Sequence, residues 1–232
     1  MSTVSVILPT YNEKENIEEL IKQILRYVGE LKEIIVVDDD SPDGTWEIAQ
    51  RMNEKKVRVI RRTNERGLAS AIARGIEEAT GEIVVWMDCD LSMPPNVIPK
   101  LLAFIPQYDI SMGSRYAVGG KDDRGLLRVI TSRMINFYAN LFLGFRVKDF
   151  DSGFIAAKKE IFSRVKLMTT GYGQYCIRFL YDSIKKGYRI KEVGFRFTDR
   201  EKGVSKSGES FIQLLQHGWS YGIEVLKIRF GG

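Results

Sequence analysis

The segment "GEIVVWMDCDLSMPP" (residues 81–95) contains an apolar run that leads directly into two aspartates. The run from Ile83 to Met87 is typical of a buried strand, and two prolines end the segment. Residues i and i+2 of an extended segment point the same way, so Asp88 and Asp90 are expected to converge if the strand geometry persists that far. Two carboxylates this close repel each other, and a divalent cation removes that cost. Oxygen ligands suit Mg²⁺ or Mn²⁺, whereas a solvated acidic turn is the alternative interpretation.

Apolar strands alternate with helical patterns through the first half of the chain. Strands are predicted at residues 4–9, 33–39, 57–62, 82–88 and 109–115. Helices are predicted at residues 12–28, with Asn12 as the cap, and at 45–54, 67–80 and 94–105. This order predicts an α/β fold with a mostly parallel central sheet flanked by helices. Beyond about residue 118 the pattern weakens, and helices and short strands packed around the first half are expected.

Polar and acidic residues gather where three of the predicted strands end. They occupy residues 10–13, residues 38–41, and the pair Asp88 and Asp90. Ligands of open α/β sheets bind outside the carboxyl ends of the strands. The sequence therefore predicts an active site at this edge of the sheet.

Composition limits the classes of partner and site. The 232 residues carry 35 basic and 30 acidic side chains, a net charge of +5 that suits anionic partners. Basic and acidic residues are interleaved and no nucleic-acid-binding module is recognisable, so nucleic acid is not expected as a partner. Cys89, Cys176 and the single His217 form no zinc-ligand pattern, and a reduced cytoplasmic environment fits. The first residues do not read as a signal peptide, and no run approaches the roughly 18 apolar residues of a membrane-spanning helix.

Several segments, in this order and spacing, resemble one enzyme family. They are "ILPTYNEKENI" (7–17), "IIVVDDDSPDGTW" (34–46), "RRTNERGLASAIARGIEEATGEIVVWMDCDLSMPP" (61–95), "GSRY" (113–116), "DFDSGF" (149–154) and "FRFTDREKGVSK" (195–206). Together they are similar to the inverting glycosyltransferases of family 2, which have the GT-A fold. Within that family the closest resemblance is to dolichol-phosphate mannose synthases. It implies a GT-A catalytic domain over residues 1–207, followed by an amphipathic, membrane-interfacial helix over residues 208–232.

The resemblance also implies roles for individual residues. Asp88 and Asp90 would hold the metal, Arg115 and Arg128 would hold the acceptor phosphate, and Asp90, Arg115 and Arg128 would be catalytic. The implied nucleotide-sugar site comprises Pro9, Tyr11, Glu13, Val37, Asp39, Asp88, Cys89, Asp90, Arg115, Arg200 and Lys206.

Four positions need separate comment. Ser92 stands where some relatives carry Gln as a further metal ligand, and a hydroxyl or a water could substitute. Lys202 stands where some relatives carry Arg. Asp149 and Asp151 flank a position where many family members place a catalytic base, and no role is assigned to either.

The implied reaction is the metal-dependent, inverting transfer of mannose from GDP-mannose to dolichyl or another polyprenyl phosphate. One alternative is UDP-glucose or another donor, and another is a polysaccharide or protein glycosyltransferase, which would need a base for a neutral hydroxyl acceptor. A non-catalytic nucleotide-sugar-binding partner subunit is the third, against which the Asp88/Asp90 pair and the basic residues argue. Arg115→Ala is expected to lower transfer much more than stability, and an ordinary solvated charge is the alternative interpretation of this residue.

A lipid acceptor requires a route to a membrane. Residues 124–148 and 209–230 mix large apolar side chains with basic ones, so both could be amphipathic helices at the membrane interface. The alternative is that they pack on the domain or in a dimer. We expect peripheral binding at the cytoplasmic face of a membrane, or recruitment by a membrane-anchoring subunit.

Overall fold

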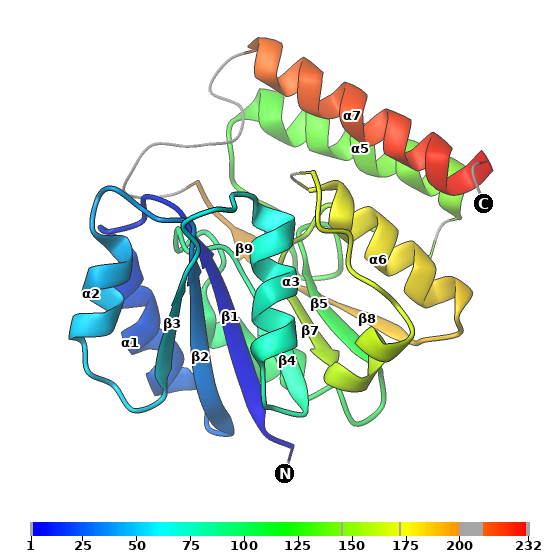
Figure 1. The fold of residues 1–232 in the computed structure, drawn as a ribbon. Helices are drawn as coiled ribbons and strands as arrows, with labels where there is room; N and C mark the ends of the chain where they lie inside the picture. The colour runs from blue at the N-terminus through cyan, green and yellow to red at the C-terminus, as the bar shows by residue number, and fades with distance from the viewer. Residues whose placement is uncertain (1, 145, 172, 200–210, 231–232) are drawn as a thin grey trace.

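A seven-stranded sheet forms the centre of the molecule (Figure 1). The computed structural model describes residues 2–144, 146–171, 173–199 and 211–230, the last range with side chains from residue 218 onward. The strand order is β3-β2-β1-β4-β7-β5-β8, and β7 alone runs antiparallel to its neighbours. The strands are β1 (Val4–Thr10), β2 (Leu31–Asp38), β3 (Val57–Arg61), β4 (Ile83–Trp86), β5 (Ile110–Ser114), β7 (Ile155–Lys158) and β8 (Ile190–Gly194). The predicted mostly parallel central sheet is confirmed.

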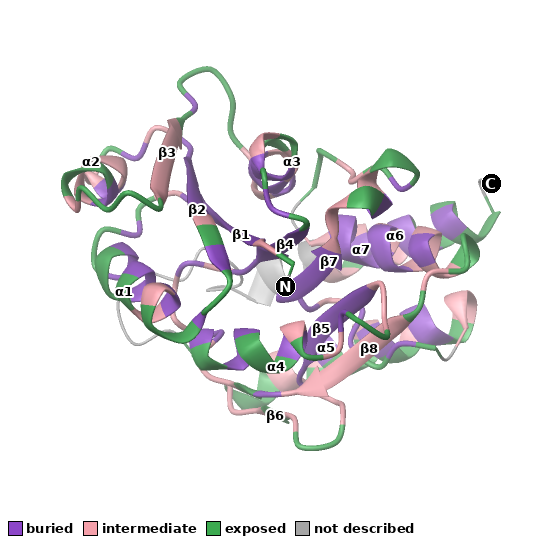
Figure 2. Cartoon of the chain, turned by 90° about the horizontal axis from the view of Figure 1, so that it is seen from below, coloured by how far each residue is buried: buried purple, intermediate pink, exposed green. Residues whose placement is uncertain are grey.

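Helices cover both faces of this sheet because alternate strand residues point to opposite sides. Ile7, Ile35 and Val84 join one core cluster with α3 (Leu68–Glu78) and α6 (Gln174–Lys185). Leu8 and Val36 join the other cluster, with α1 (Ile17–Tyr27), α2 (Thr45–Arg51) and α4 (Ile98–Leu102), the last preceded by the 3₁₀ turn η1 (Pro95–Val97). Figure 2 shows the buried strands between helices whose outer faces are exposed. Burial on both faces explains the unbroken apolar runs in the sequence.

The first helix begins later than the sequence suggests. It starts at Ile17 with Asn16 at its N-cap, so the prediction that Asn12 caps a helix is wrong. Asn12 instead adopts a left-handed backbone conformation with φ of 53°. Its N–H donates to the Ser41 hydroxyl at 3.0 Å, which ties the loop after β1 to the loop after β2. This loop, rather than a helical turn, lies at the carboxyl end of the sheet.

Two long helices lie side by side across the carboxyl ends of the parallel strands (Figure 1). They are α5 (Leu126–Leu143) and α7 (Phe211–Phe230), which pack against each other, and α7 also packs against α6. Tyr221, Val225 and Ile228 of α7 are buried. The described part of α7 therefore packs on the rest of the protein, whereas the predicted domain boundary at residue 207 lies outside the described residues. No helix in the described ranges has the length and apolarity needed to cross a membrane.

Two short strands form a separate two-stranded parallel sheet. β6 (Lys121–Asp122) pairs with β9 (Arg196–Phe197), and this brings the loop after β5 next to the segment that precedes residue 200. The 3₁₀ turn η2 (Lys159–Ser163) follows β7. The β6–β9 pair matters for the site because it positions Phe197 and Arg124 at the carboxyl edge of the sheet.

Candidate active site

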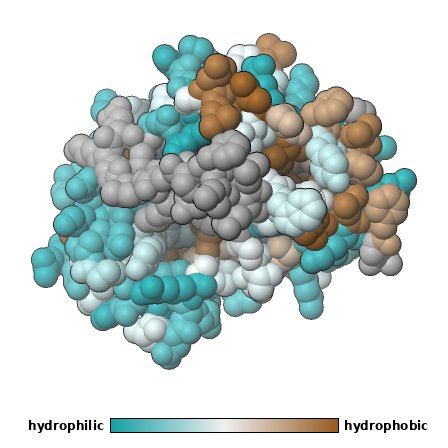
Figure 3. All heavy atoms as spheres, turned by 90° about the horizontal axis from the view of Figure 1, so that it is seen from above, coloured by the Kyte–Doolittle hydropathy of each residue, from teal (hydrophilic) through white to brown (hydrophobic). Residues whose placement is uncertain are grey.

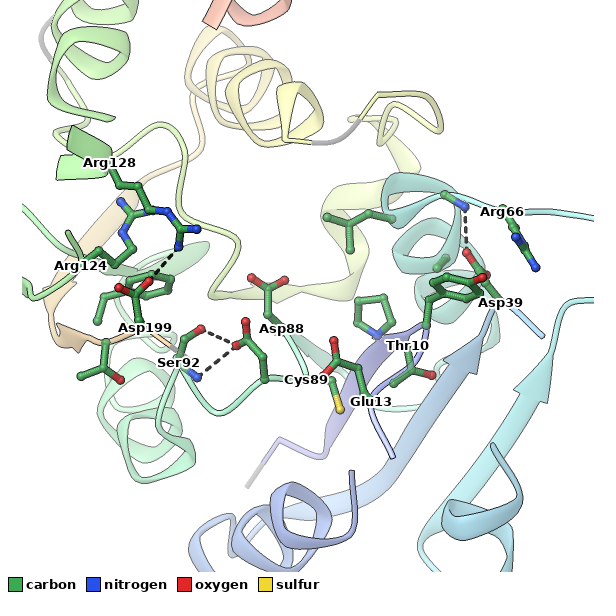
Figure 4. Close-up of a pocket in the computed structure, with 18 residues that line it drawn as sticks. Thr10, Glu13, Asp39, Arg66, Asp88, Cys89, Ser92, Arg124, Arg128 and Asp199 are labelled. Atoms are coloured by element: carbon green, nitrogen blue, oxygen red, sulfur yellow. Dashed lines mark hydrogen bonds and ion pairs between the residues drawn. The ribbon is translucent and has the colours of Figure 1, made fainter. Parts of the chain in front are cut away.

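The loops that follow β1, β2 and β4 enclose a cavity of about 320 Å³, here called the first cavity. It brings together seven of the residues predicted for nucleotide-sugar binding, together with Arg128. Its lining includes Pro9, Tyr11, Glu13, Asp39, Arg66, Gly67, Asp88, Cys89, Asp90, Ser92, Arg124, Arg128, Phe197 and Asp199. Figure 4 shows Asp88 directed into the middle, with Asp39 and Arg66 on one side and Arg124, Arg128 and Asp199 on the other.

Val37 is not in this cavity. Its side chain is fully buried in the core cluster that includes Ile7 and α3, because it points to a face of the sheet rather than past its end. A Cβ added to Gly75 of α3 would lie 3.3 Å from Val37, which shows how closely the helix approaches. The Val37 side chain therefore packs in the core and does not line the first cavity, and the nucleotide-binding role of this residue stays a prediction.

The two aspartates meet the cavity through a bend rather than through a continued strand. β4 ends at Trp86, the chain bends from Cys89 onward, before Asp90, and Leu91 has a left-handed φ of 64°. Ser92 donates to Asp90 Oδ1 from its hydroxyl at 2.5 Å and from its N–H at 3.1 Å (Figure 4). Ser92 thus orients the second aspartate.

The carboxylate oxygens at this cavity fit a hard divalent cation as ligands. Asp88 and Asp90 both line the first cavity, and their carboxylate oxygens are ligands that Mg²⁺ and Mn²⁺ accept. No group of three or more His, Cys, Asp or Glu side chains that could hold a metal occurs in the described ranges. Mg²⁺ is commonly held by one or two carboxylates, with water and substrate phosphates completing its shell. The two aspartates are sufficient protein ligands for such an ion.

Asp39 builds the wall of the first cavity through a buried ion pair. Its Oδ1 accepts from Arg62 Nε at 2.7 Å, and its Oδ2 accepts from the N–H of Gly67 at 2.8 Å. Gly67 has φ of 145°, a conformation that glycine adopts without strain. Each carboxylate oxygen has two acceptor positions, so Oδ2 can still accept from a ligand. Asp39 therefore serves both the wall and the cavity.

Sequence reasoning missed two residues of this wall. Arg66 lies over the Tyr11 ring at 4.7 Å from its centroid, and Gly67 joins the same loop to Asp39. Both belong to the quoted segment "RRTNERGLAS", so a signal was present. A charged residue in a loop reads as solvated by default, and its stacking on a ring from another strand end requires the fold.

A second cavity of about 170 Å³ adjoins the first, and Asp88, Arg124, Arg128 and Phe197 line both. Arg115 lines the second cavity and not the first, which changes its predicted place in the donor pocket to one beside Asp88. The further lining includes Ser132, Asp151, Ser152, Gly153, Gly173, Tyr175, Cys176 and Tyr221. Residues from α5, α6 and α7 thus meet the end of β4 here.

Arg115 is held by a buried carboxylate. Its Nε and Nη2 donate to Asp149 at 2.9 and 2.6 Å, and its backbone N–H donates to the same group at 2.9 Å. Although burial alone would lower the pKa of Arg115, Asp149 raises it well above its ordinary value. The pair is nearly inaccessible, since the side chains are 4% and 0% exposed. Arg115 is therefore a fixed cation, which excludes the alternative that it is an ordinary solvated charge.

Asp149 and Asp151, the two carboxylates to which no role was assigned from the sequence, have different surroundings in the structure. Asp149 is the buried ion-pair partner of Arg115. Asp151 lines the second cavity, and its Oδ2 lies 3.5 Å from Arg115 Nη2. Burial raises the pKa of Asp151 above its ordinary value, although Arg115 and a hydrogen bond from Tyr221 act in the opposite direction. Asp149 is thus a structural counter-ion, whereas Asp151 faces the site.

Two further arginines stand at the junction of the cavities. Arg128 donates to Asp199 at 2.9 Å, and Arg124 donates to Asp122 at 2.8 and 2.7 Å. The Arg124 guanidinium also lies over the Phe197 ring at 5.0 Å from its centroid. No site role was predicted for Arg124 from the sequence, although Arg128 of the same segment was assigned to the acceptor phosphate. The predicted basic residues Arg200 and Lys206, with Lys202, lie outside the described residues.

Comparisons with known proteins agree with this geometry. Residues 5–166 match the family described as "Glycosyl transferase family 2". A "Dolichol-phosphate mannosyltransferase" from Pyrococcus furiosus is 44% identical over 223 residues, which cover 92% of this chain and 62% of that protein. A "Polyprenol monophosphomannose synthase" from Mycolicibacterium smegmatis is 33% identical over 218 residues, which cover 90% of this chain and 82% of that protein.

Solved structures show the same fold. Glucosyl-3-phosphoglycerate synthase from Mycobacterium tuberculosis, in complex with Mn²⁺, UDP and glucosyl-3-phosphoglycerate, superposes with a TM-score of 0.77 and 22% identity, covering 98% of this chain and 80% of that one. The same enzyme with Mg²⁺ and UDP gives 0.77 and 21%, covering 98% and 79%. This likeness concerns the fold alone, which is the GT-A fold that the sequence resemblance implied. The family match covers most of the chain, and the Mycolicibacterium smegmatis relative is 33% identical with 82% of its own length covered. The chain therefore belongs to glycosyl transferase family 2.

Proposed function

We propose that this protein transfers mannose, with inversion, from GDP-mannose to dolichyl or another polyprenyl phosphate in a metal-dependent reaction. The names of the two relatives support this acceptor class and this sugar. The observation that carries the proposal is the position of Asp88, which lines both cavities. A donor in the first cavity and an acceptor in the second would meet at this residue.

The first cavity suits a nucleoside diphosphate sugar. Tyr11 and Arg66 offer a stacked ring and cation, and Asp39 offers an acceptor oxygen on the same side (Figure 4). Asp88 and Asp90 would hold the divalent cation, which, when bound, supplies Lewis-acid stabilisation of the departing diphosphate. Arg124 and Arg128 stand across the cavity and would add positive charge at the same leaving group.

The second cavity suits a phosphate monoester. Arg115, Arg124 and Arg128 line it, so three guanidinium groups surround a space of about 170 Å³. A phosphate monoester has a second pKa of about 6 and is already anionic near neutral pH. Such an acceptor can attack the sugar without a general base, so the burial of Asp149 against Arg115 is compatible with the reaction. The work of the site is to orient two anions that would otherwise repel each other.

An apolar surface over α5 and α7 supports a lipid-borne acceptor. It consists of exposed Leu126, Leu127, Ile130, Met134, Phe137 and Leu141 on α5, and Trp219, Ile223, Leu226 and Phe230 on α7. Figure 3 shows apolar residues gathered on one part of this face, with a hydrophilic part beside it. Both helices also contribute residues to the second cavity. The surface would rest on the cytoplasmic face of a membrane, so that a polyprenyl chain leaves the cavity toward lipid.

The test is transfer by the purified chain. Polyprenyl phosphate in vesicles is incubated with labelled GDP-mannose, and separately with labelled UDP-glucose, with Mg²⁺, with Mn²⁺ or with a chelator. Mannosyl lipid that forms only with GDP-mannose and metal is the expected product, and Asp90→Ala should abolish it while the fold is retained. Glucosyl lipid alone would identify the other donor, and product formed equally with chelator would refute the metal role. Flotation of the isolated chain with vesicles separates direct membrane binding from recruitment by an anchoring subunit.

A further inference from the structure

Helix α7 places one side chain inside the second cavity. Tyr221 is 6% exposed and, of the α7 side chains that the structure describes, it is the one that lines this cavity. A Cβ added to Gly173 would lie 1.7 Å from Tyr221 Oη and 3.1 Å from Asp151 Oδ1. The hydroxyl and the carboxylate therefore share the small space beside Gly173, where they form a hydrogen bond. A residue from the C-terminal helix thus contacts an acidic group of the site.

This contact continues to the fixed cation of the cavity. Asp151 Oδ2 lies 3.5 Å from Arg115 Nη2, whereas Asp149 binds the same guanidinium at 2.6 Å. Arg115 is thus held by one carboxylate that is completely buried and by a second that faces the cavity. From α7, the Tyr221 hydroxyl is the group that reaches Asp151, and its hydrogen bond acts to lower the pKa of this carboxylate. Tyr221, Asp151 and Arg115 form a continuous series of polar contacts.

Polar contacts with α6 fix the register of α7. Gln174 Nε2 donates to Ser220 Oγ at 2.7 Å, immediately before Tyr221. One turn further along, Arg178 pairs with the buried Glu224 at 3.0 Å. Trp219 and Ile223 lie within two residues of Tyr221 and are 74% and 37% exposed on the apolar surface. The same turn of helix therefore carries a side chain of the cavity and side chains of the apolar surface.

We propose that Tyr221 is a positioning residue of the transfer reaction: through its hydroxyl, α7 holds Asp151, the carboxylate that faces the acceptor cavity next to the fixed Arg115. The inference rests on the proposed function of the second cavity. It makes α7 part of the acceptor site as well as of the apolar surface.

Two substitutions disturb this contact in different ways. Tyr221→Phe removes the hydroxyl and keeps the ring, while Gly173→Ala keeps the tyrosine and fills the space its hydroxyl occupies. Gly173 has φ of −119°, so alanine meets no backbone strain there. The matched control is Tyr138→Phe, since Tyr138 also lies at the α5–α7 contact, 3.9 Å from the position of a Cβ on Gly222, and its side chain lines neither cavity.

The steady-state parameters for each substrate separate positioning from general damage. Both variants should lower kcat/KM for a short-chain polyprenyl phosphate by about tenfold or more, the effect of losing one hydrogen bond to a charged group. The KM for GDP-mannose should stay at the wild-type value in both variants, and Tyr138→Phe should behave as wild type. The midpoint of thermal unfolding should stay near the wild-type value in Tyr221→Phe and fall in Gly173→Ala, because the added Cβ overlaps the Tyr221 hydroxyl. Wild-type kinetics in Tyr221→Phe would overturn the proposal. So would equal losses toward donor and acceptor that follow a lowered midpoint.

A crystal structure of Tyr221→Phe gives a second measurement that needs no turnover. A displaced Asp151 side chain would support the proposal, and an unchanged position would overturn it. If the wild-type protein makes no mannosyl lipid, the proposed function fails. The crystal structure still decides whether Tyr221 positions Asp151.

Discussion

Arg115→Ala should damage both the fold and the reaction, because the arginine is the partner of a completely buried carboxylate. The substitution leaves Asp149 with the backbone N–H of residue 115 at 2.9 Å and Asn136 Nδ2 at 3.4 Å as its remaining donors. Removing one member of a buried pair costs about 3–5 kcal/mol. For a chain of this size 1 kcal/mol corresponds to about 2–4 °C, so the midpoint of unfolding should fall by about 6–20 °C. This revises the expectation that the residue matters little for stability.

A double-mutant cycle tests the reasoning. Arg115→Met, Asp149→Asn and the double variant are unfolded with urea and by heat, each followed by circular dichroism. The double variant removes both charges, so its loss should be smaller than the sum of the two single losses by at least about 1 kcal/mol. All three should lose most transfer activity, because each removes or displaces the cation beside Asp88. Additive stability losses, or an Arg115→Met protein as stable as the wild type, would refute the buried pair.

Three further predictions address the metal, the sheet and the apolar surface. Ser92→Ala removes the hydroxyl that donates a hydrogen bond to Asp90 Oδ1 at 2.5 Å. It should weaken Mn²⁺ binding by about tenfold or more, measured by titration calorimetry with GDP present. An unchanged affinity would mean that Ser92 does not orient Asp90. Burial alone would raise the pKa of Asp109, but the N–H of Arg189 and the ammonium group of Lys158 hold it below its ordinary value. Asp109→Asn should therefore lower the urea midpoint at pH 7, and its difference from wild type should shrink as the pH falls below about 4, whereas a pH-independent difference would contradict the sign. Replacing either Phe137 or Trp219, which are 64% and 74% exposed, by Ser should weaken flotation with anionic vesicles by about tenfold, and unchanged flotation would remove the apolar surface from membrane binding.

The parallel half of the sheet could be predicted from the sequence because burial on both faces leaves continuous apolar runs. The run that contains Val84 and Trp86 is an example, since the two residues pack in one cluster while Val85 packs in the other. β7 gives no such signal. Its four residues, Ile155–Lys158, include two alanines, and pairing antiparallel between β4 and β5 is a tertiary event. Local propensity therefore reveals the first strands and not the one inserted between them.

The site was predicted at the correct edge of the sheet, although one local reason for it was wrong. Asp88 and Asp90 do line one cavity, but a bend at Leu91 and the hydrogen bond from Ser92 bring them there after the strand has ended. The sequence did not reveal that Asp149 is the buried partner of Arg115, because 34 residues separate them. Strand order places a motif at the carboxyl edge of the sheet. The partner of each charged side chain there depends on distant segments.

The arginines of the two cavities differ in how readily they could exchange partners for phosphate. The Arg115–Asp149 pair is buried, and breaking it would leave a charge without solvent, so Arg115 stays in place. Arg128 and Asp199 are 28% and 50% exposed, and such a pair contributes about 0.2–1 kcal/mol. Because a guanidinium–phosphate contact is usually stronger, Arg128 can leave Asp199 for an incoming anion at little cost. A fixed cation beside an exchangeable one would let the second cavity bind an incoming anion at a defined place.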